Sequence, residues 1–358
     1  MSPPVTIAVD AMGGDGAPAV EVEGSLLAAE EFGARILLVG RQRALRRELS
    51  RHFPAKGQIE IVNANDVVTM NDNPSVALRS KKDSSIRVAA KLVHEGKAAG
   101  LVSAGNTGAV MASALQGMGR IPGVKRPAVA QVFPTGSGGR TLVLDVGANV
   151  DCTAAMLAEF AVMGHVYARV MFGCERPRVG LLSIGEEDHK GNELTRETMA
   201  LLRKRTLNFV GNVEGRDLFS GNADVVVCDG FVGNVALKVS EGLVSTIKTM
   251  LIKSLEATVM RQIGYGLAKG AFEEFQKRVD YEEYGGAPML GVRGGVIICH
   301  GRSTRQAVKN AVRVAVDFET GGIMRQIETS LERNLEAGAA PREPAAGPAP
   351  SATPSRPA

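Results

Sequence analysis

A strand-turn-helix segment at residues 224–242, DVVVCDGFVGNVALKVSEG, most constrains how this chain can fold. Residues 225–228 form a short apolar run, which is typical of a strand buried on both faces of a parallel sheet. Asp229-Gly230 ends the run, and we expect a helix to begin near Val235. The free backbone N–H groups at the start of that helix would point beyond the end of the strand, where they can bind an anion.

The same order of strand, polar glycine-containing turn and helix recurs four more times along the chain. The strand-like runs lie at 7–10, 101–103, 141–146 and 179–184, and further runs at 36–39 and 59–62 alternate with helical patterns. This alternation predicts β-α-β units with right-handed crossovers. The expected fold is therefore α/β, a doubly wound, mostly parallel sheet with helices on both faces (an α/β/α sandwich). We expect the five turns to line one carboxyl edge of the sheet, where ligands bind.

A helical hairpin is predicted within one catalytic domain that spans residues 1–335. Apolar residues recur at helical spacing after Asn234, and Gly264-Tyr265-Gly266 interrupts the pattern before a second amphipathic stretch at 267–279. The hairpin, at about 235–280, would project from the sheet and form a homodimer interface. An alternative is that its apolar tip also touches a membrane surface. Residues 336–358 are rich in Ala and Pro, so we expect a disordered tail there.

Composition excludes several classes of function. The net charge of +4 over 42 basic and 38 acidic side chains, together with the lack of Trp, argues against nucleic-acid binding. The four cysteines are widely spaced, as in a reduced, cytoplasmic protein. No run is long and apolar enough to span a membrane. The acidic run at 186–188 has no further ligands at metal-binding spacing, so we expect neither a metal nor a cofactor.

The turn at 101–114, LVSAGNTGAVMASA, is a candidate ligand site because its small residues let a ligand approach the backbone. Ser103, Asn106 and Thr107 add hydrogen-bond partners there. Tight packing of a helix on the sheet is the structural alternative. The basic run at 79–85, which includes Lys82, is either a solvated helix end or a site for phosphate or an acidic carrier protein.

Eight sequence blocks resemble the bacterial phosphate acyltransferase family known as PlsX. The blocks are IAVDAMGGDGAP, RSKKDSSI, SAGNTGA, DVGANVDC, LLSIGEEDHKGNE, FVGNVEGRD, VVVCDGFVGN and YGGAPMLGVRGGVIICHGRS, and the similarity runs from about Val5 to Gln326. The resemblance implies transfer of a long-chain fatty acyl group from acyl carrier protein to inorganic phosphate. The acyl phosphate would feed phospholipid synthesis through a membrane glycerol-3-phosphate acyltransferase. The chain departs from the family at Gly16, where the family usually has His.

The chemistry of this transfer places few demands on the protein. Phosphate near neutral pH is partly dianionic and can attack a thioester, so the site needs an anion pocket, donors for the oxyanion and help for a thiol of pKa about 8 to 9. We choose Lys190 for the charge on the phosphate or oxyanion, and Asn192 and Asn234 to orient phosphate or carbonyl. His300 could donate to the thiolate or hold the carrier's arm. Their structural alternatives are an exposed loop lysine, helix caps and a supporting hydrogen-bonded His.

The remaining residues of the predicted phosphate and substrate site lie in the same turns and blocks. They are Asp10, Gly14, Asp15, Lys82, Ser103, Asn106, Thr107, Gly108, Asn149, Asp229, Gly233 and Arg302. Two other functions stay open at this point. One is a phosphate acyltransferase that uses short-chain acyl-coenzyme A. The other is a membrane-associated scaffold of lipid synthesis that has lost catalysis, an idea raised by Gly16.

Overall fold

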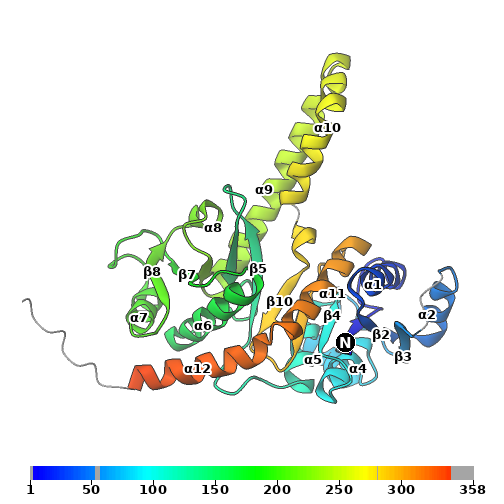
Figure 1. Cartoon of the computed structure of the whole chain (residues 1–358), viewed down its shortest axis with the longest axis horizontal. Coiled ribbons are helices and arrows are strands. Elements are labelled where there is room, and N and C mark those ends of the chain that lie inside the picture. Colours follow the sequence, from blue (N-terminus) through cyan, green and yellow to red (C-terminus); the bar gives the residue numbers. More distant parts are fainter. Residues whose placement is uncertain (1–2, 53–56, 280, 340–358) are drawn as a thin grey trace, which may run out of the picture.

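The computed structural model describes residues 3–52, 57–279 and 281–339 and is built on one mixed sheet (Figure 1). Its strands are β1 (Thr6–Asp10), β2 (Arg35–Gly40), β3 (Ile59–Asn63), β4 (Gly100–Ser103), β5 (Ala128–Pro134), β6 (Arg140–Leu144), β7 (Arg178–Leu182), β8 (Asn208–Val213), β9 (Val225–Val227), β10 (Ala287–Leu290) and β11 (Gly295–Ile298). The strand order is β3-β2-β1-β4-β11-β10-β5-β6-β9-β7-β8.

The helices follow the strands closely, as the sequence pattern predicts. They are α1 (Ala19–Phe32), α2 (Gln42–Leu49), α3 (Pro74–Ser80), α4 (Ser85–His94), α5 (Thr107–Gly117), α6 (Ala154–Met171), α7 (Glu193–Leu202), α8 (Asp217–Ser220), α9 (Gly230–Glu256), α10 (Val259–Val279), the short 3-10 helix η1 (Tyr281–Tyr284), α11 (Arg305–Thr320) and α12 (Ile323–Ala339).

Three antiparallel ladders divide the sheet into two parallel blocks. Strand β10 is antiparallel to both β11 and β5, and β5 is antiparallel to β6. The ladders on either side of these strands are parallel, so the mostly parallel sheet is confirmed. Because three reversals separate the blocks, they run in opposite directions. The expectation that five turns share one carboxyl edge is therefore wrong, since alternation of strands and helices does not reveal where antiparallel strands reverse a sheet.

Helices cover both faces of the sheet, which confirms the predicted sandwich. In β1, Ile7 and Val9 pack in a buried cluster with α1 and α11, whereas Ala8 between them joins a cluster with α4 and α5. In β6, Leu142 and Leu144 pack in a cluster with α6 and α12. The side chains of successive strand residues point to opposite faces, so each apolar strand contributes to two layers of core.

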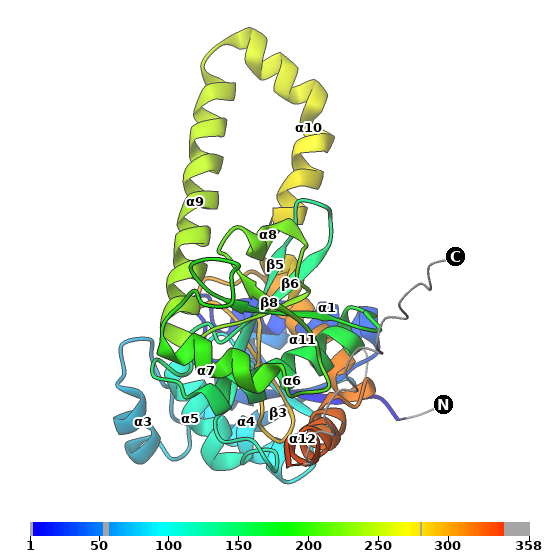
Figure 2. The same ribbon diagram turned by 90° about the vertical axis from the view of Figure 1, so that its left-hand side faces the viewer.

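Helices α9 and α10 form the predicted hairpin, which projects far from the sheet (Figures 1 and 2). Helix α9 begins at Gly230, five residues before the expected Val235, because the Asp229 side chain accepts a hydrogen bond from the Val232 N–H and caps it. The early start leaves only Cys228 and Asp229 between β9 and the helix. The structure thus gives the hairpin a base that is attached directly to the end of a buried strand.

The turn of the hairpin lies between Glu256 and Val259, and the predicted break at 264–266 is wrong. Those residues continue α10, because a glycine inside a helix costs only about 1 kcal/mol and does not end it. Thr258 starts α10 instead, since its hydroxyl accepts a hydrogen bond from the Arg261 N–H. The position of the turn is therefore set by the cap at Thr258 and not by the two glycines.

The chain end is partly outside the described residues. Helix α12 continues to Ala339, so residues 336–339, which we assigned to the tail, are helical. The rest of the predicted tail, 340–358, lies outside the described residues. Among the described helices, none is both long and apolar enough to cross a membrane.

Candidate active site

Turns at the ends of β1, β4 and β11, three neighbouring strands, form one group of candidate residues. The fully buried Asp10 accepts a hydrogen bond of 2.7 Å from the Ser103 hydroxyl, and Ser103 in turn accepts one from the Gly105 N–H. The Asp15 N–H donates to the Gly301 carbonyl at 2.8 Å. Burial raises the pKa of Asp10, and hydrogen bonds from Ser85 and Ser103 partly offset this. The three turns are therefore tied to one another.

Glu21 belongs to this group, although the sequence analysis missed it. Its side chain is only 2% exposed, and a Cβ added to Gly14 would lie 2.2 Å from its Oε1. Burial raises the pKa of Glu21 to about 7, and the nearby Asp10 and Asp15 add to the shift. The available signal was an acidic residue in the first helical turn behind the Gly-Gly-Asp-Gly segment. That signal resembles any favourable helix start, so it did not stand out.

Asn106 and Gly108 serve packing in this structure. The Asn106 amide oxygen caps α5 by accepting from Ala109 N–H, and its amide nitrogen donates to the carbonyls of Met70 and Asp72. A Cβ on Gly108 would come within 2.7 Å of Pro74. Thr107 beside them is exposed. These contacts match the structural alternative for Asn106 and Gly108, and their part in substrate binding stays a prediction.

His300, Arg302 and Lys82 are all exposed. The His300 Nδ1 accepts a hydrogen bond from the Arg302 N–H at 3.2 Å. The two residues therefore lie in the turn after β11, next to Gly301, whose carbonyl accepts the hydrogen bond from the Asp15 N–H. Lys82 lies elsewhere, at a small cavity with Arg87 and Lys91. The structure therefore brings His300 and Arg302 to the first group of turns and shows no contact between Lys82 and it.

Asp145 organises the second group of turns, and it too was missed. The buried carboxylate accepts hydrogen bonds from the backbone N–H groups of Val129, Gly147, Ala148 and Asn149, and from the Asn149 side chain at 2.9 Å. The Asn149 amide also donates to the Pro127 carbonyl. Asn149 is thus a structural brace of this turn. The DVGAN segment held the signal, but a strand-end Asp looks the same whether it binds ligand or backbone.

The start of α9 packs directly on this turn. The Gly230 N–H donates to the Asn149 carbonyl at 2.7 Å, and a Cβ on Gly233 would lie 1.8 Å from the Asp145 carbonyl oxygen. Only glycine permits that approach. Asn234 follows, and its amide oxygen lies 3.6 Å from the position of a Cβ added to Gly147. Its exposed side chain makes no hydrogen bond among the described residues, so it is available to a ligand.

The Lys190 loop follows β7, the neighbour of β9 in the sheet. Two of the acidic residues around it are paired, Glu186 with Arg216 and Asp188 with Arg203, whereas Glu187 between them has no ion pair among the described residues. Lys190 is half-buried, and its ammonium has no ion pair among the described residues. Asn192 caps α7 by accepting from the Thr195 N–H at 2.9 Å. The structure shows no contact between Lys190 and Asn234, so their joint action stays a prediction.

Cys152 lies beside the second group of turns. The Cys152 thiol donates to the Asn149 carbonyl, and burial raises its pKa to about 11, so it stays protonated near neutral pH. It therefore lacks the thiolate that a covalent route would need. Across the described ranges, no three His, Cys, Asp or Glu side chains gather in a way that could hold a metal ion.

Comparison with known proteins decides the family. Residues 5–326 match the family described as "Fatty acid synthesis protein". The chain belongs to this family. It is 53% identical to the phosphate acyltransferase of Trichlorobacter lovleyi over 331 residues, which cover 92% of this chain and 96% of that one. It is 54% identical to the phosphate acyltransferase of Geobacter sp. over 342 residues, covering 96% and 97%.

Solved structures support the fold. A phosphotransacetylase from Streptococcus pyogenes superposes with a TM-score of 0.59 at 19% identity and covers 89% of this chain and 95% of its own. EutD phosphotransacetylase from Staphylococcus aureus gives a TM-score of 0.55 at 18% identity, covering 88% and 94%. At such identities the likeness shows the fold alone. The family membership makes the protein an acyltransferase, as the resemblance of the eight blocks implied.

Proposed function

We propose that the protein transfers a long-chain fatty acyl group from acyl carrier protein to inorganic phosphate. A phosphate oxygen attacks the thioester carbonyl carbon, the C–S bond breaks, and the carrier thiolate takes up a proton. The products are acyl phosphate and free carrier protein. One observation carries the proposal: the Lys190 ammonium has no ion pair among the described residues, while two acidic side chains of the same loop, Glu186 and Asp188, are held by arginines. A cation left free in this way can bind phosphate.

The residues take separate roles in this mechanism. Lys190 offsets the charge of phosphate or of the tetrahedral oxyanion. Asn234 presents its free amide beside the Gly147 turn and orients the carbonyl or the phosphate. Asn192 and Asp229 fix the starts of α7 and α9, whose N–H groups favour a nearby anion. His300 belongs to the first group of turns, which does not share a sheet edge with Lys190 and Asn234, so we assign it to holding the carrier's arm, and water protonates the leaving thiolate.

The donor is a proposal in its own right, and a direct comparison tests it. Purified protein is given palmitoyl-acyl carrier protein, palmitoyl-coenzyme A or acetyl-coenzyme A, each with and without phosphate, and free thiol is measured. We expect phosphate-dependent release to be fastest from the carrier-protein thioester. Faster release from acetyl-coenzyme A would establish the short-chain alternative. No release from any donor, with normal binding of carrier protein, would support the scaffold.

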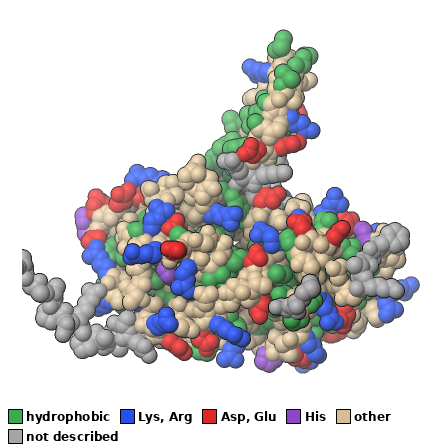
Figure 3. Space-filling model, in the orientation of Figure 1, with side chains coloured by type: hydrophobic (Ala, Val, Ile, Leu, Met, Phe, Trp, Pro, Cys, Tyr) green, Lys and Arg blue, Asp and Glu red, His purple; other side chains and the backbone are tan. Residues whose placement is uncertain are grey.

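The hairpin is proposed to join two copies of the chain and to touch the membrane surface. Large apolar side chains stay exposed along it, and Figure 3 shows them along the projection and at its tip. On α9 they include Val235, Val239, Leu243, Val244, Ile247, Met250, Leu251 and Ile252, and on α10 they include Val259, Met260, Ile263 and Leu267. Exposed apolar surface of this extent marks an interface.

We assign the long face of the hairpin to a homodimer and its tip to the membrane. A cytoplasmic protein that contacts the membrane in this way could deliver the apolar acyl phosphate to a membrane glycerol-3-phosphate acyltransferase. The sedimentation behaviour of the purified protein tests the dimer. A monomer at micromolar concentration would contradict it.

A further inference from the structure

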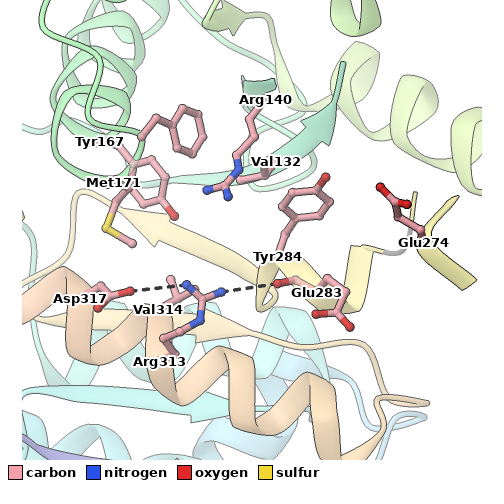
Figure 4. Close-up of a pocket in the computed structure, with 11 residues that line it drawn as sticks. Val132, Arg140, Tyr167, Met171, Glu274, Glu283, Tyr284, Arg313, Val314 and Asp317 are labelled. Carbon is pink, nitrogen blue, oxygen red and sulfur yellow. Dashed lines mark hydrogen bonds and ion pairs between the residues drawn. The ribbon is translucent and has the colours of Figure 1, made fainter. Parts of the chain in front are cut away.

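A cavity of about 370 Å³ lies away from the candidate active site. Arg140, at the start of β6, lines it, whereas Asp145 follows the last residue of the same strand. Five strand residues span about 16 Å, so the cavity and the Asp145 turn lie at opposite ends of β6. The other walls come from β5, α6, α11, η1 and the base of α10 (Figure 4). A volume above about 300 Å³ is in the range of ligand pockets.

Two hydrogen-bond donors in this cavity have no acceptor among the described residues. Tyr167 is 2% exposed, its hydroxyl makes no hydrogen bond among the described residues, and it points into the cavity (Figure 4). Burial raises the pKa of Tyr167, so the hydroxyl keeps its proton as a donor. The hydroxyl therefore offers an unused donor to whatever occupies the cavity.

Arg140 is the second donor. Its guanidinium carbon lies 5.9 Å from the ring centre of Phe172 and 5.8 Å from that of Tyr284. Stacking on aromatic faces orients a guanidinium but leaves the N–H groups at its edge unused. Arg140 forms no ion pair among the described residues, and its nitrogens point into the cavity (Figure 4). Its positive charge is therefore held in place and not neutralised.

The acidic side chains near the cavity do not compensate Arg140. Asp317 is paired with Arg313 at 3.6 Å, and the same arginine donates to the Glu283 carbonyl at 3.4 Å. In the view of Figure 4, Tyr167 lies on one side of Tyr284, and the carboxylates of Glu274 and Glu283 lie on the other side. On one side of the cavity Asp317 and Arg313 are paired, and on the other side Arg140 and Tyr167 present donors that no described residue uses.

We propose that this cavity is a second ligand site, separate from the reaction, that binds a small organic anion. The phosphate or carboxylate group accepts hydrogen bonds from Arg140 and Tyr167, and an apolar body packs on Val132, Met171 and Val314. A volume of about 370 Å³ holds about a dozen non-hydrogen atoms at the density of liquid water, which matches a compound of one ring and one anionic group. Because η1 and α10 line the cavity, its occupant touches the base of the hairpin.

Calorimetric titration of the full-length protein with phenyl phosphate tests the site, with benzoate and benzyl alcohol as companion probes. We expect phenyl phosphate or benzoate to bind and neutral benzyl alcohol not to bind. Loss of a hydrogen bond to a charged group weakens binding roughly 10-fold or more. Arg140→Gln should therefore weaken binding by about that factor, and Tyr167→Phe by less. The more tightly bound anion identifies the favoured headgroup.

Lys190→Ala is the control, because phenyl phosphate could also enter the catalytic phosphate site. We expect this variant to bind the probe as the wild type does. Equal binding by wild type and Arg140→Gln, loss of binding in Lys190→Ala, or no binding of either anion would each overturn the proposal. Arg140 is exposed, so its substitution should leave the melting temperature unchanged. Arg140→Lys keeps the positive charge but lacks the planar guanidinium that stacks on the rings, so it separates the effect of charge from that of stacking.

Discussion

The close contact of Gly233 with the Asp145 turn allows a sharp test of how α9 positions Asn234. In Gly233→Ala, the new methyl group would lie 1.8 Å from the Asp145 carbonyl oxygen. An ordinary contact needs about 3.4 Å, so the helix start must move by more than 1 Å. Overpacking of this kind costs about 1–3 kcal/mol, and loss of the Gly230 hydrogen bond to Asn149 adds about 1 kcal/mol. We expect a loss of about 2–4 kcal/mol in the free energy of unfolding.

We expect the rate of acyl transfer to fall as well, even under conditions in which the variant stays folded. Asn234 moves with the helix, and a displacement of about 1 Å at a reacting centre costs on the order of 100-fold in rate. Urea unfolding and phosphate-dependent thiol release measure the two effects. Gly242→Ala is the matched control, because this glycine is in the same helix and a Cβ there meets nothing within 4 Å. That variant should gain about 0.5–1 kcal/mol in stability and keep its activity. Equal behaviour of the two variants would refute the reasoning.

Two further predictions follow from other parts of the molecule. Glu21 has a folded pKa of about 7 against an ordinary value of 4.5, so stability should fall as the pH rises from about 4.5 to 7 and then level off. Glu21→Gln should reduce this fall by up to about 3 kcal/mol, measured by urea unfolding at pH 5 and pH 8, and an unchanged pH dependence would contradict the burial argument. At the hairpin tip, Met260→Glu with Ile263→Glu should abolish flotation with anionic liposomes. Val76→Glu, an equally exposed position on α3, should not, and unchanged flotation of the double variant would exclude the tip as the membrane contact.

Local patterns predicted most elements because they depend on neighbouring residues. The buried strand before Asp229, the cap at Asn192 and the two helices of the hairpin all depend on residues within a few positions of one another. The direction of the two blocks could not be predicted in this way. It depends on the pairing of β10 with β5, which lie more than 150 residues apart in the chain.

The candidate site was predicted only in part, because some of its residues form local sequence patterns and others do not. The turns that carry Lys190 and Asn234 were recognisable, since Gly and Asn next to a helix start form a local pattern. Asp145 and Glu21 were not, because their importance comes from burial and from partners such as Val129, which no local pattern shows. Asn149 looked like a ligand residue, yet its amide is engaged by Asp145 and Pro127. Turn chemistry alone does not separate a residue that binds ligand from one that braces the turn.

Direct observation of the acyl phosphate tests the central claim most closely. Palmitoyl-acyl carrier protein and phosphate are incubated with the wild type or with Lys190→Ala of equal melting temperature, and the products are followed by phosphorus NMR. The account predicts an acyl phosphate signal that grows with the release of free thiol in the wild type and is nearly absent in the variant. Thiol release without an acyl phosphate, or equal acyl phosphate from both proteins, would contradict it.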